Sequence, residues 1–366
     1  AQAAGSQVWR QPRSQATRSS PLFFSWYCCT AVVVAVGSVL LVVPAVREVM
    51  LKPATGLVRP PVRCLPMPSI ANRTNCYRDD WVDEMMRVDD SAGHRVIVDV
   101  GCNTGSDSVV WLERFSSRHR GVSASWVEQL ARSGIRGGSC NGNILHEFAT
   151  RDAGAQPGRA LVLCVEAAPN TVELLKDVAQ AVLGGGDGAL RVVAAAASAA
   201  PGTADFPSVV AGEEAAGLGG PGYLSKVDEQ GTVSVRVTTV DELVAEHDLP
   251  SVDVLTIDAE GFDPSVLRGA EATLRAGSVR YLVFEVHQDF RDSVWERTSL
   301  WSEVAFLDSI GYDCFWAGNN GQVQRLTGCW DEKMESSQYP IEWSNVVCAK
   351  RKDVWHDVLQ SFDKGV

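Results

Sequence analysis

Short apolar runs, many of them β-branched, recur along the chain from residue 95 onward. They cover residues 95–100, 160–165, 191–196, 252–257 and 279–286, and stretches with helical character lie at 106–118, 171–183 and 264–276. Continuous apolar strands that alternate with helices are typical of a parallel sheet covered on both faces. The pattern therefore predicts an α/β fold built on a mostly parallel sheet.

Three further segments extend this prediction. Residues 232–239 alternate between apolar and polar side chains, which indicates an additional half-exposed strand. Residues 312–316 and 343–350 fit an antiparallel hairpin that closes the sheet. The glycine-rich stretch 211–222 reads as a loop.

The N-terminal part of the chain has a different pattern. Residues 23–46 carry no charge, and a membrane-spanning helix needs about 20 apolar residues. Arginines precede this segment and a proline-rich stretch follows it, so we expect a cytoplasmic tail at 1–22, a transmembrane signal-anchor at 23–46 and a stem at 47–92. A cleaved signal peptide and a buried core helix are the alternatives.

The remaining 274 residues divide, on this interpretation, into a catalytic domain at 93–290 and an extension at 291–366 that completes the sheet. In the anchored orientation the domain faces the lumen of an endomembrane compartment, as in a single-pass type II protein of the Golgi or endoplasmic reticulum. Asn72 would then be a luminal glycosylation site, because it begins an Asn-Arg-Thr sequon.

The composition limits the classes of ligand that the chain can bind and bears on the oxidation state of its cysteines. The 366 residues carry a net charge of -12, which disfavours a nucleic-acid partner and suits a neutral or cationic ligand. Ten cysteines show no regular metal-binding spacing. We expect Cys102 and Cys164 to be buried thiols. Six others could form disulfides if the domain is luminal: Cys64, Cys76, Cys140, Cys314, Cys329 and Cys348.

A glycine turn follows the first predicted strand of the domain. It contains Asp99, Gly101, Asn103 and Gly105. Glycines at a strand-to-helix turn let a ligand approach the backbone at the carboxyl edge of a sheet. A nicotinamide site would have three glycines, and an acid at the strand end repels a pyrophosphate but attracts a sulfonium or ammonium group. A tight turn without a ligand is the alternative.

An acid also follows the second predicted strand. Glu166 is placed to accept hydrogen bonds from both ribose hydroxyls of an adenosine, or it is a solvated carboxylate at a strand end. Such an acid usually lies about 20 residues beyond the glycine turn, and Glu166 lies further on. We infer an insertion between Arg118 and Arg159.

Two more pairs of polar residues follow the last predicted strands. Asp258 and Glu260 come after residues 252–257, so both carboxylates would face the crevice at the end of this strand. The alternative is that Asp258 caps the next helix. Glu285 lies near the end of the run 279–286 and His287 directly follows it; His287 could accept a proton from a hydroxyl or be structural. We expect no metal site, although Asp258, Glu260 and Glu285 could together hold one divalent ion through oxygen ligands.

Taken in order, these motifs resemble the FkbM-type methyltransferases. The resemblance rests on Asp99 to Gly105, Glu166-Ala-Ala-Pro-Asn, Ile257-Asp-Ala-Glu-Gly and Val266-Leu-Arg-Gly-Ala, and it covers residues 96–287. It implies a Rossmann-like class I methyltransferase sandwich with S-adenosylmethionine as the methyl donor. The matching donor-site positions are Asp99, Gly101, Asn103, Gly105, Glu166 and Asp258.

The resemblance also implies an activity, which is O-methylation of a hydroxyl on a saccharide or small natural product. The candidates for catalysis are His287, Asp258 and Glu260. The acceptor and the oligomeric state do not carry over from the family. The alternatives are a nicotinamide-dependent oxidoreductase, a non-catalytic membrane-anchored binding protein and a luminal glycosyltransferase, the last without an Asp-x-Asp motif in the domain.

Overall fold

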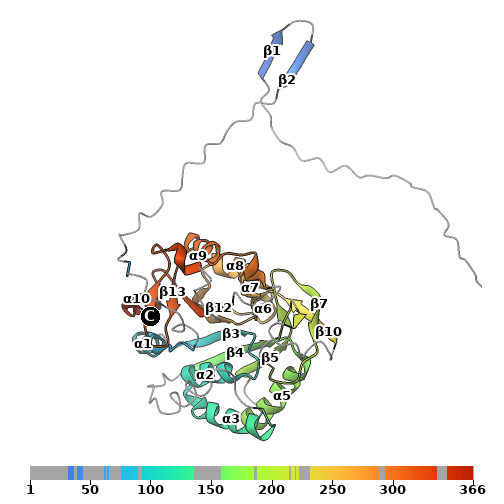
Figure 1. The fold of residues 1–366 in the computed structure, drawn as a ribbon, viewed down its shortest axis with the longest axis vertical. Coiled ribbons are helices and arrows are strands. Elements are labelled where there is room, and N and C mark those ends of the chain that lie inside the picture. Colours follow the sequence, from blue (N-terminus) through green and yellow to red (C-terminus); the bar gives the residue numbers. More distant parts are fainter. Residues whose placement is uncertain are drawn as a thin grey trace, which may run out of the picture. The chain divides into compact units, whose positions relative to one another are not determined.

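The computed structural model of the chain divides into two compact units, Ala1–Pro60 and Pro61–Val366 (Figure 1). It describes residues 32–36, 39–43, 62, 64–65, 76–89, 93–135, 158–184, 188–213, 216–218, 220–221, 231–287, 293–335 and 344–365. The predicted glycosylation site Asn72 lies outside these ranges.

An eight-stranded sheet forms the centre of the larger unit, in the order β14-β13-β15-β12-β11-β3-β4-β5. The five strands from β12 to β5 are parallel, and β15 joins β12 in antiparallel fashion. The predicted mostly parallel sheet with an antiparallel closing hairpin is therefore confirmed. The strands are β3 His94–Val100, β4 Arg159–Glu166, β5 Leu190–Ala194, β11 Val252–Ile257, β12 Val279–Val286, β13 Tyr312–Ala317, β14 Val323–Arg325 and β15 Ser344–Lys350.

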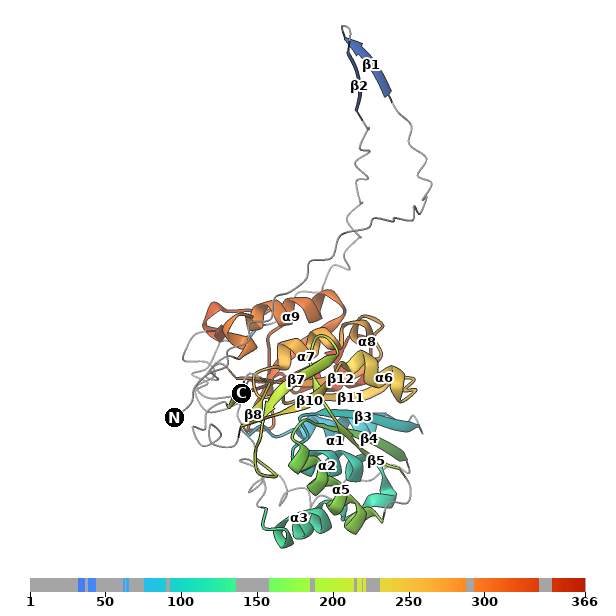
Figure 2. The same cartoon turned by 90° about the vertical axis from the view of Figure 1, so that its right-hand side faces the viewer.

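Helices cover both faces of this sheet, because the strands alternate their side chains between two apolar cores. Val98 and Val100 pack on one side and Ile97 on the other. Figure 2 shows the two helical layers above and below the strands. The face with Val98 and Val100 is covered by α6 Val240–Glu246, α7 Asp263–Gly269, α8 Glu271–Arg275 and α9 Leu300–Ser309. The opposite face is covered by α1 Asp80–Val88, α2 Ser106–Phe115, α3 Val122–Arg132, α5 Pro169–Leu183 and α10 Val354–Ser361.

A smaller sheet adjoins the main one. The predicted strand at 232–239 is β10 Thr232–Thr238, which pairs with β7 Gly202–Pro207 and β6 Ala196–Ala197. The strand expected at 191–196 is divided between β5 and β6, and the helix expected at 264–276 is divided at Ala270 into α7 and α8. Two-residue strands β8 Ala216–Gly217 and β9 Gly220–Pro221 pair within the glycine-rich stretch. Three 3-10 turns complete the described elements: Ser117–His119, Val294–Glu296 and Glu332–Glu335.

The N-terminal unit differs from the expected membrane-spanning helix in its secondary structure. Where a helix was expected over residues 23–46, the structure has antiparallel strands β1 Val32–Val36 and β2 Val39–Val43, with Val36 opposite Val39. Valine is β-branched and favours strands, a preference that a count of apolar residues ignores. Within the described part of the chain, no helix combines the length and apolarity required to span a bilayer.

The cysteines form disulfides in the larger unit: Cys64–Cys329, Cys102–Cys164 and Cys314–Cys348. The expectation of buried thiols at Cys102 and Cys164 is wrong. Their Cα atoms lie 5.4 Å apart because Cys102 follows β3 and Cys164 lies in the neighbouring strand β4, within the range that a disulfide requires.

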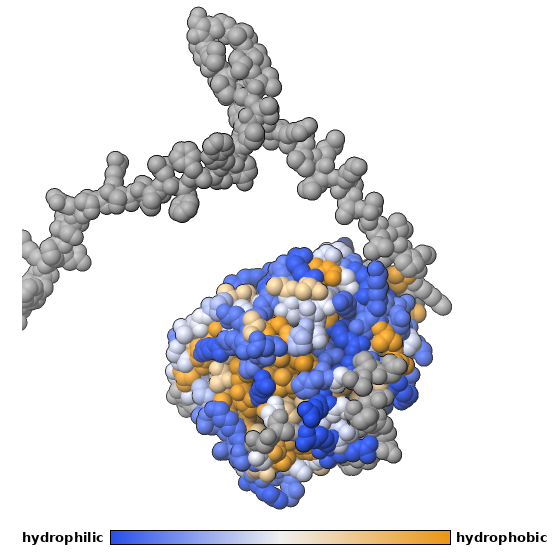
Figure 3. All heavy atoms as spheres, turned by 180° about the vertical axis from the view of Figure 1, so that it is seen from behind, coloured by the Kyte–Doolittle hydropathy of each residue, from blue (hydrophilic) through white to orange (hydrophobic). Residues whose placement is uncertain are grey.

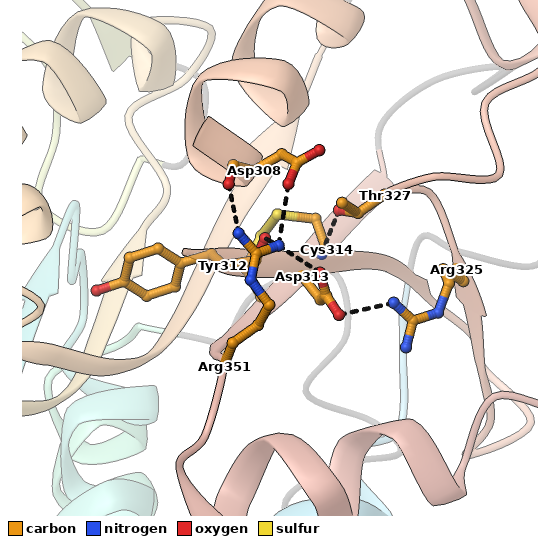
Figure 4. The surroundings of a disulfide bond; sticks show 8 residues. Asp308, Tyr312, Asp313, Cys314, Arg325, Thr327 and Arg351 are labelled. Carbon is orange, nitrogen blue, oxygen red and sulfur yellow. Dashed lines mark hydrogen bonds and ion pairs between the residues drawn. A yellow bond between two sulfur atoms is a disulfide. The ribbon is translucent and has the colours of Figure 1, made fainter. Parts of the chain in front are cut away.

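Ion pairs surround the disulfide that links β13 and β15 (Figure 4). Arg351 contacts both Asp308 and Asp313 at 2.9 Å, and Arg325 contacts Asp313 at 2.8 Å. Burial alone would raise the pKa of Asp313, but its contact with His356 and those with the two arginines hold that pKa below its usual range. The closing strands are thus fixed by a covalent bond and by a compensated buried carboxylate.

The surface of the larger unit carries both hydrophilic and apolar side chains. On the face in Figure 3, hydrophilic side chains surround a central area where apolar side chains gather. Trp301 on α9 is one of the few large apolar side chains that are exposed, and its ring lies 5.3 Å from that of Trp330. Trp295 and Trp316 are buried in the core.

Candidate functional site

The turn between β3 and α2 is built around two glycines with positive φ, Gly101 at 78° and Gly105 at 73°. A Cβ on Gly101 would lie 1.7 Å from the backbone oxygen of Asp258, and one on Gly105 would lie 2.9 Å from the ring of Trp126. Only glycine fits either position, because a side chain would meet its neighbours and would also strain the backbone. The predicted glycine turn is therefore present and closely packed.

Glu166 holds this turn from the next strand. Its Oε2 accepts a hydrogen bond from the Asn103 backbone N–H at 3.0 Å, and its Oε1 accepts one from Ala168 at 2.7 Å. The side chain is only 8% exposed. Burial raises the pKa of Glu166 to about 7, although both hydrogen bonds oppose the shift. Glu166, for which a contact with a ribose was expected, thus fixes the backbone of Asn103.

Asp99 lies under the turn and is 5% exposed. It accepts a 2.6 Å hydrogen bond from the hydroxyl of Thr256 and another from Ser108 on α2. Burial raises its pKa, and the two hydroxyls oppose that shift. Asp99 therefore ties β3 to β11 and to α2. Sequence reasoning missed both hydroxyl partners, and the polar Thr256 within an apolar strand was the available signal.

The carboxylates expected to act together lie at one edge of the sheet. Asp99 pairs in register with Cys164 on one side and with Thr256 on the other, so the strand ends that carry Glu166 and Asp258 flank the turn. The backbone N–H of Asp258 donates to Val100 at 2.9 Å. The negative charge of Asp99 contributes to the raised pKa of Glu166. Such mutual repulsion favours a positively charged ligand.

Three acids gather beyond β11 and β12. Oxygen atoms of Asp258, Glu260 and Glu285 all lie within 4.8 Å of one another. Burial raises the pKa of Glu285 well above its usual value, and the charges of Asp258, Glu260 and Asp263 raise it further. Glu260 has a φ of 50°, a conformation that costs a non-glycine residue about 1 kcal/mol or more. Strained residues of this kind concentrate at functional sites.

Asp263 supports this group from the start of α7 and was not predicted as a site residue. Its Oδ1 accepts a 3.0 Å hydrogen bond from the backbone N–H of Glu285, and its side chain is fully buried. Burial and the charge of Asp258 raise its pKa.

His287 follows β12 at the same edge and is half-buried. Burial lowers the pKa of its imidazole to about 4, so the ring is neutral at physiological pH and able to accept a proton. Its backbone oxygen accepts a hydrogen bond from Ser293 at 3.4 Å. The catalytic role assigned to His287 stays a prediction.

The glycine-rich stretch also borders the acids. A Cβ on Gly217 of β8 would lie 3.0 Å from the backbone oxygen of Glu260. This segment was expected only as a loop, and its place beside Glu260 could not be read from its composition.

An α/β unit with a large, mostly parallel sheet and an acid-lined glycine turn fits a methyltransferase-like domain. The model of the family described as Methyltransferase FkbM domain matches residues 137–314, which confirms the resemblance drawn from the motifs. The match includes Glu166, Asp258, Glu260 and His287 and begins after the glycine turn at Gly101. Comparisons with curated proteins and with solved structures gave no match.

Proposed function

We propose that this chain is an S-adenosylmethionine-dependent methyltransferase that methylates a hydroxyl oxygen of a saccharide or other small molecule. The observation that carries the proposal is the contact between Glu166 and the backbone of Asn103. It joins the ends of two parallel strands into one acidic turn, which suits a cationic adenosine compound.

The turn fits such a donor in a second respect. The side-chain oxygen of Asn103 is buried and has no hydrogen-bond partner among the residues described. A buried hydrogen-bond acceptor without a partner lowers the stability of the fold by about 1–3 kcal/mol. A hydrogen bond from the ammonium or a hydroxyl group of bound S-adenosylmethionine would remove this cost. Asn103, Glu166 and Asp258 would therefore hold the donor.

When bound, S-adenosylmethionine supplies a methyl group on a sulfonium. The acceptor oxygen forms a bond to that methyl carbon as the carbon–sulfur bond breaks, so the products are a methyl ether and S-adenosylhomocysteine. His287 is the candidate to take the hydroxyl proton, because its imidazole is neutral; Asp258 and Glu260 are the other candidates. Alignment of the acceptor by the protein can lower the barrier by about 7–11 kcal/mol.

Titration calorimetry of the full chain with S-adenosylhomocysteine and, separately, with NADH tests the proposal. We expect binding of the first ligand and none of the second. Glu166→Ala should weaken binding at least about tenfold, since a lost hydrogen bond to a charged group costs about 1.5–3 kcal/mol. Glu303→Gln is the control, because Glu303 is also buried but lies in α9 and pairs with Arg268 of α7.

The alternatives predict different results. Binding of NADH alone would indicate the oxidoreductase. Binding of S-adenosylhomocysteine without methyl transfer to any of a panel of saccharides and phenols would indicate a non-catalytic binding protein.

We also propose that the domain resides in an oxidising compartment, either luminal or extracellular. Disulfides persist there and are rare in the cytosol. Three are present in the described part of the larger unit, one of them directly in the glycine turn. Mass spectrometry after alkylation without reductant should leave Cys102, Cys164, Cys314 and Cys348 unmodified; alkylation of these cysteines in protein isolated from its own cells would refute the assignment.

A further inference from the structure

We propose that Asp258, Glu260 and Glu285 bind one hard divalent cation, such as Mg²⁺ or Mn²⁺, beside the glycine turn. Asp258 and Glu260 follow β11, and Glu285 lies near the end of β12; the carboxyl ends of these adjacent parallel strands meet at the same edge. Their oxygens lie within 4.8 Å of one another. Oxygens that share a cation at about 2.0–2.6 Å must lie within about 5 Å of each other, so the spacing suits a common ion.

A second observation points to a cation independently of this clustering. Oε2 of Glu285 and Oδ2 of Asp263 are buried and lack hydrogen-bond partners, and these side chains are 7% and 0% exposed. Neither acid forms an ion pair with a lysine, arginine or histidine of the described ranges. Burial of a carboxylate without compensation is costly, so these acids require a cation or shared protons.

The same fold compensates buried acids elsewhere with basic side chains. Glu303 pairs with Arg268 at 2.6 Å, and Asp253 pairs with Arg95 at 3.1 Å and Arg280 at 3.3 Å. Glu285 is different, because no lysine, arginine or histidine of the described ranges pairs with it and its Oε2 is buried without a hydrogen-bond partner. A divalent cation would supply positive charge there and accepts several oxygen ligands. The absence of cysteine or histidine from the three ligands favours Mg²⁺ or Mn²⁺ over Zn²⁺.

The position of the site suggests its use, and this step rests on the proposed function. Asp258 is joined to the turn through its hydrogen bond to Val100, and its carbonyl contacts Gly101. A cation at Asp258 would therefore lie next to the donor and could bind the acceptor hydroxyl, lowering the pKa of that hydroxyl. The acceptor class is then an oxygen-rich molecule, such as a sugar with neighbouring hydroxyls, that chelates a hard metal.

Electron paramagnetic resonance of free Mn²⁺, titrated with the full chain after treatment with a chelator, tests the site directly. We expect one Mn²⁺ bound per chain, displaced by excess Mg²⁺. Glu285→Gln and Asp258→Asn should each weaken Mn²⁺ binding by about tenfold or more. Asp258 is exposed, so its variant should fold even if Glu285→Gln does not. Glu303→Gln should bind Mn²⁺ like the wild type.

Two results would overturn the site: no Mn²⁺ bound by the wild type, or affinities of both variants equal to that of the control. The first would mean that Glu285 and its neighbours share protons instead. Methyl transfer undiminished in chelator would remove the cation from the reaction but not from the protein. Mn²⁺ binding without any binding of S-adenosylhomocysteine would instead contradict the proposed function and leave the metal site intact.

Discussion

The carbonyl oxygen of Asp258 occupies the space that a side chain on Gly101 would need, since a Cβ there would lie 1.7 Å from it. The chain after β11 thus crosses directly over the turn after β3. This contact couples the glycine turn to the strand end that is followed by Asp258 and Glu260.

Substitution of Gly101 tests this contact. Gly101→Ala should destabilise the domain by more than about 3 kcal/mol, because it adds a clash with the backbone to the cost of a positive φ. Gly121 is a close control: its φ is 75° against 78° for Gly101, but nothing lies within 4 Å of its Cβ position. Gly121→Ala should therefore cost only about 1–2 kcal/mol. Urea unfolding measures both, and equal losses would contradict the packing argument.

Removal of the disulfide in the turn should affect donor binding as well as stability. The Cys102–Cys164 bond closes a sequence separation of 62 residues, so its loss should cost about 4 kcal/mol by loop entropy. Replacement of both cysteines by alanine should also weaken S-adenosylhomocysteine binding, because Cys102 lies between Gly101 and Asn103. Calorimetry and thermal melts measure the two effects.

The control for that prediction is the Cys314–Cys348 pair, which spans 34 residues between β13 and β15. Its replacement by alanines should lower stability by a similar amount, about 4 kcal/mol, and leave donor affinity unchanged. A loss of donor affinity in both double variants would show that the effect is one of general stability.

Glu166 should make stability depend on pH. Its pKa rises from 4.5 to about 7 on folding because it is buried, so the folded state binds the proton more tightly. Its contribution is fully present below pH 4.5 and is lost as the pH rises through about 7. The whole difference amounts to about 3 kcal/mol.

Denaturant unfolding of the wild type and of Glu166→Gln, without ligand, checks this sign. The wild type should lose stability relative to the variant between pH 5 and pH 8. Glutamine keeps the shape of the protonated acid, so the variant should lack this component. A wild type that gains stability relative to the variant over the same range would contradict the raised pKa.

His287→Gln should lower the rate of methyl transfer without weakening donor binding. Loss of a general base typically reduces a rate by about 10²–10⁴-fold. His356→Gln is the control, since His356 is buried away from the sheet edge where His287 lies and contacts Asp313 of β13 at 2.9 Å. Steady-state kinetics with a methyl-acceptor panel measure both, and an unchanged kcat for His287→Gln would assign the proton to Asp258 or Glu260.

Much of the domain was predictable because its signals are local. The run 252–257 became β11 with the same bounds, since a short buried strand between turn residues has a strong pattern. The structure has strands such as Val32–Val36 where a helix was expected, because hydrophobicity alone does not distinguish a spanning helix from valine-rich strands. The partners of Asp99 were missed, because Ser108 and Thr256 come from different elements and only the polar Thr256 within an apolar strand pointed to them.

The sequence by itself determined the alternation of strands and helices, the glycine turn and the acids at the strand ends, since each depends on neighbours along the chain. Only the tertiary structure decided that Cys102 bonds to Cys164, that Asp99 is held by two hydroxyls and that Asp263 supports Glu285. These contacts depend on which strands lie side by side and in what register, and spacing along the chain does not specify that.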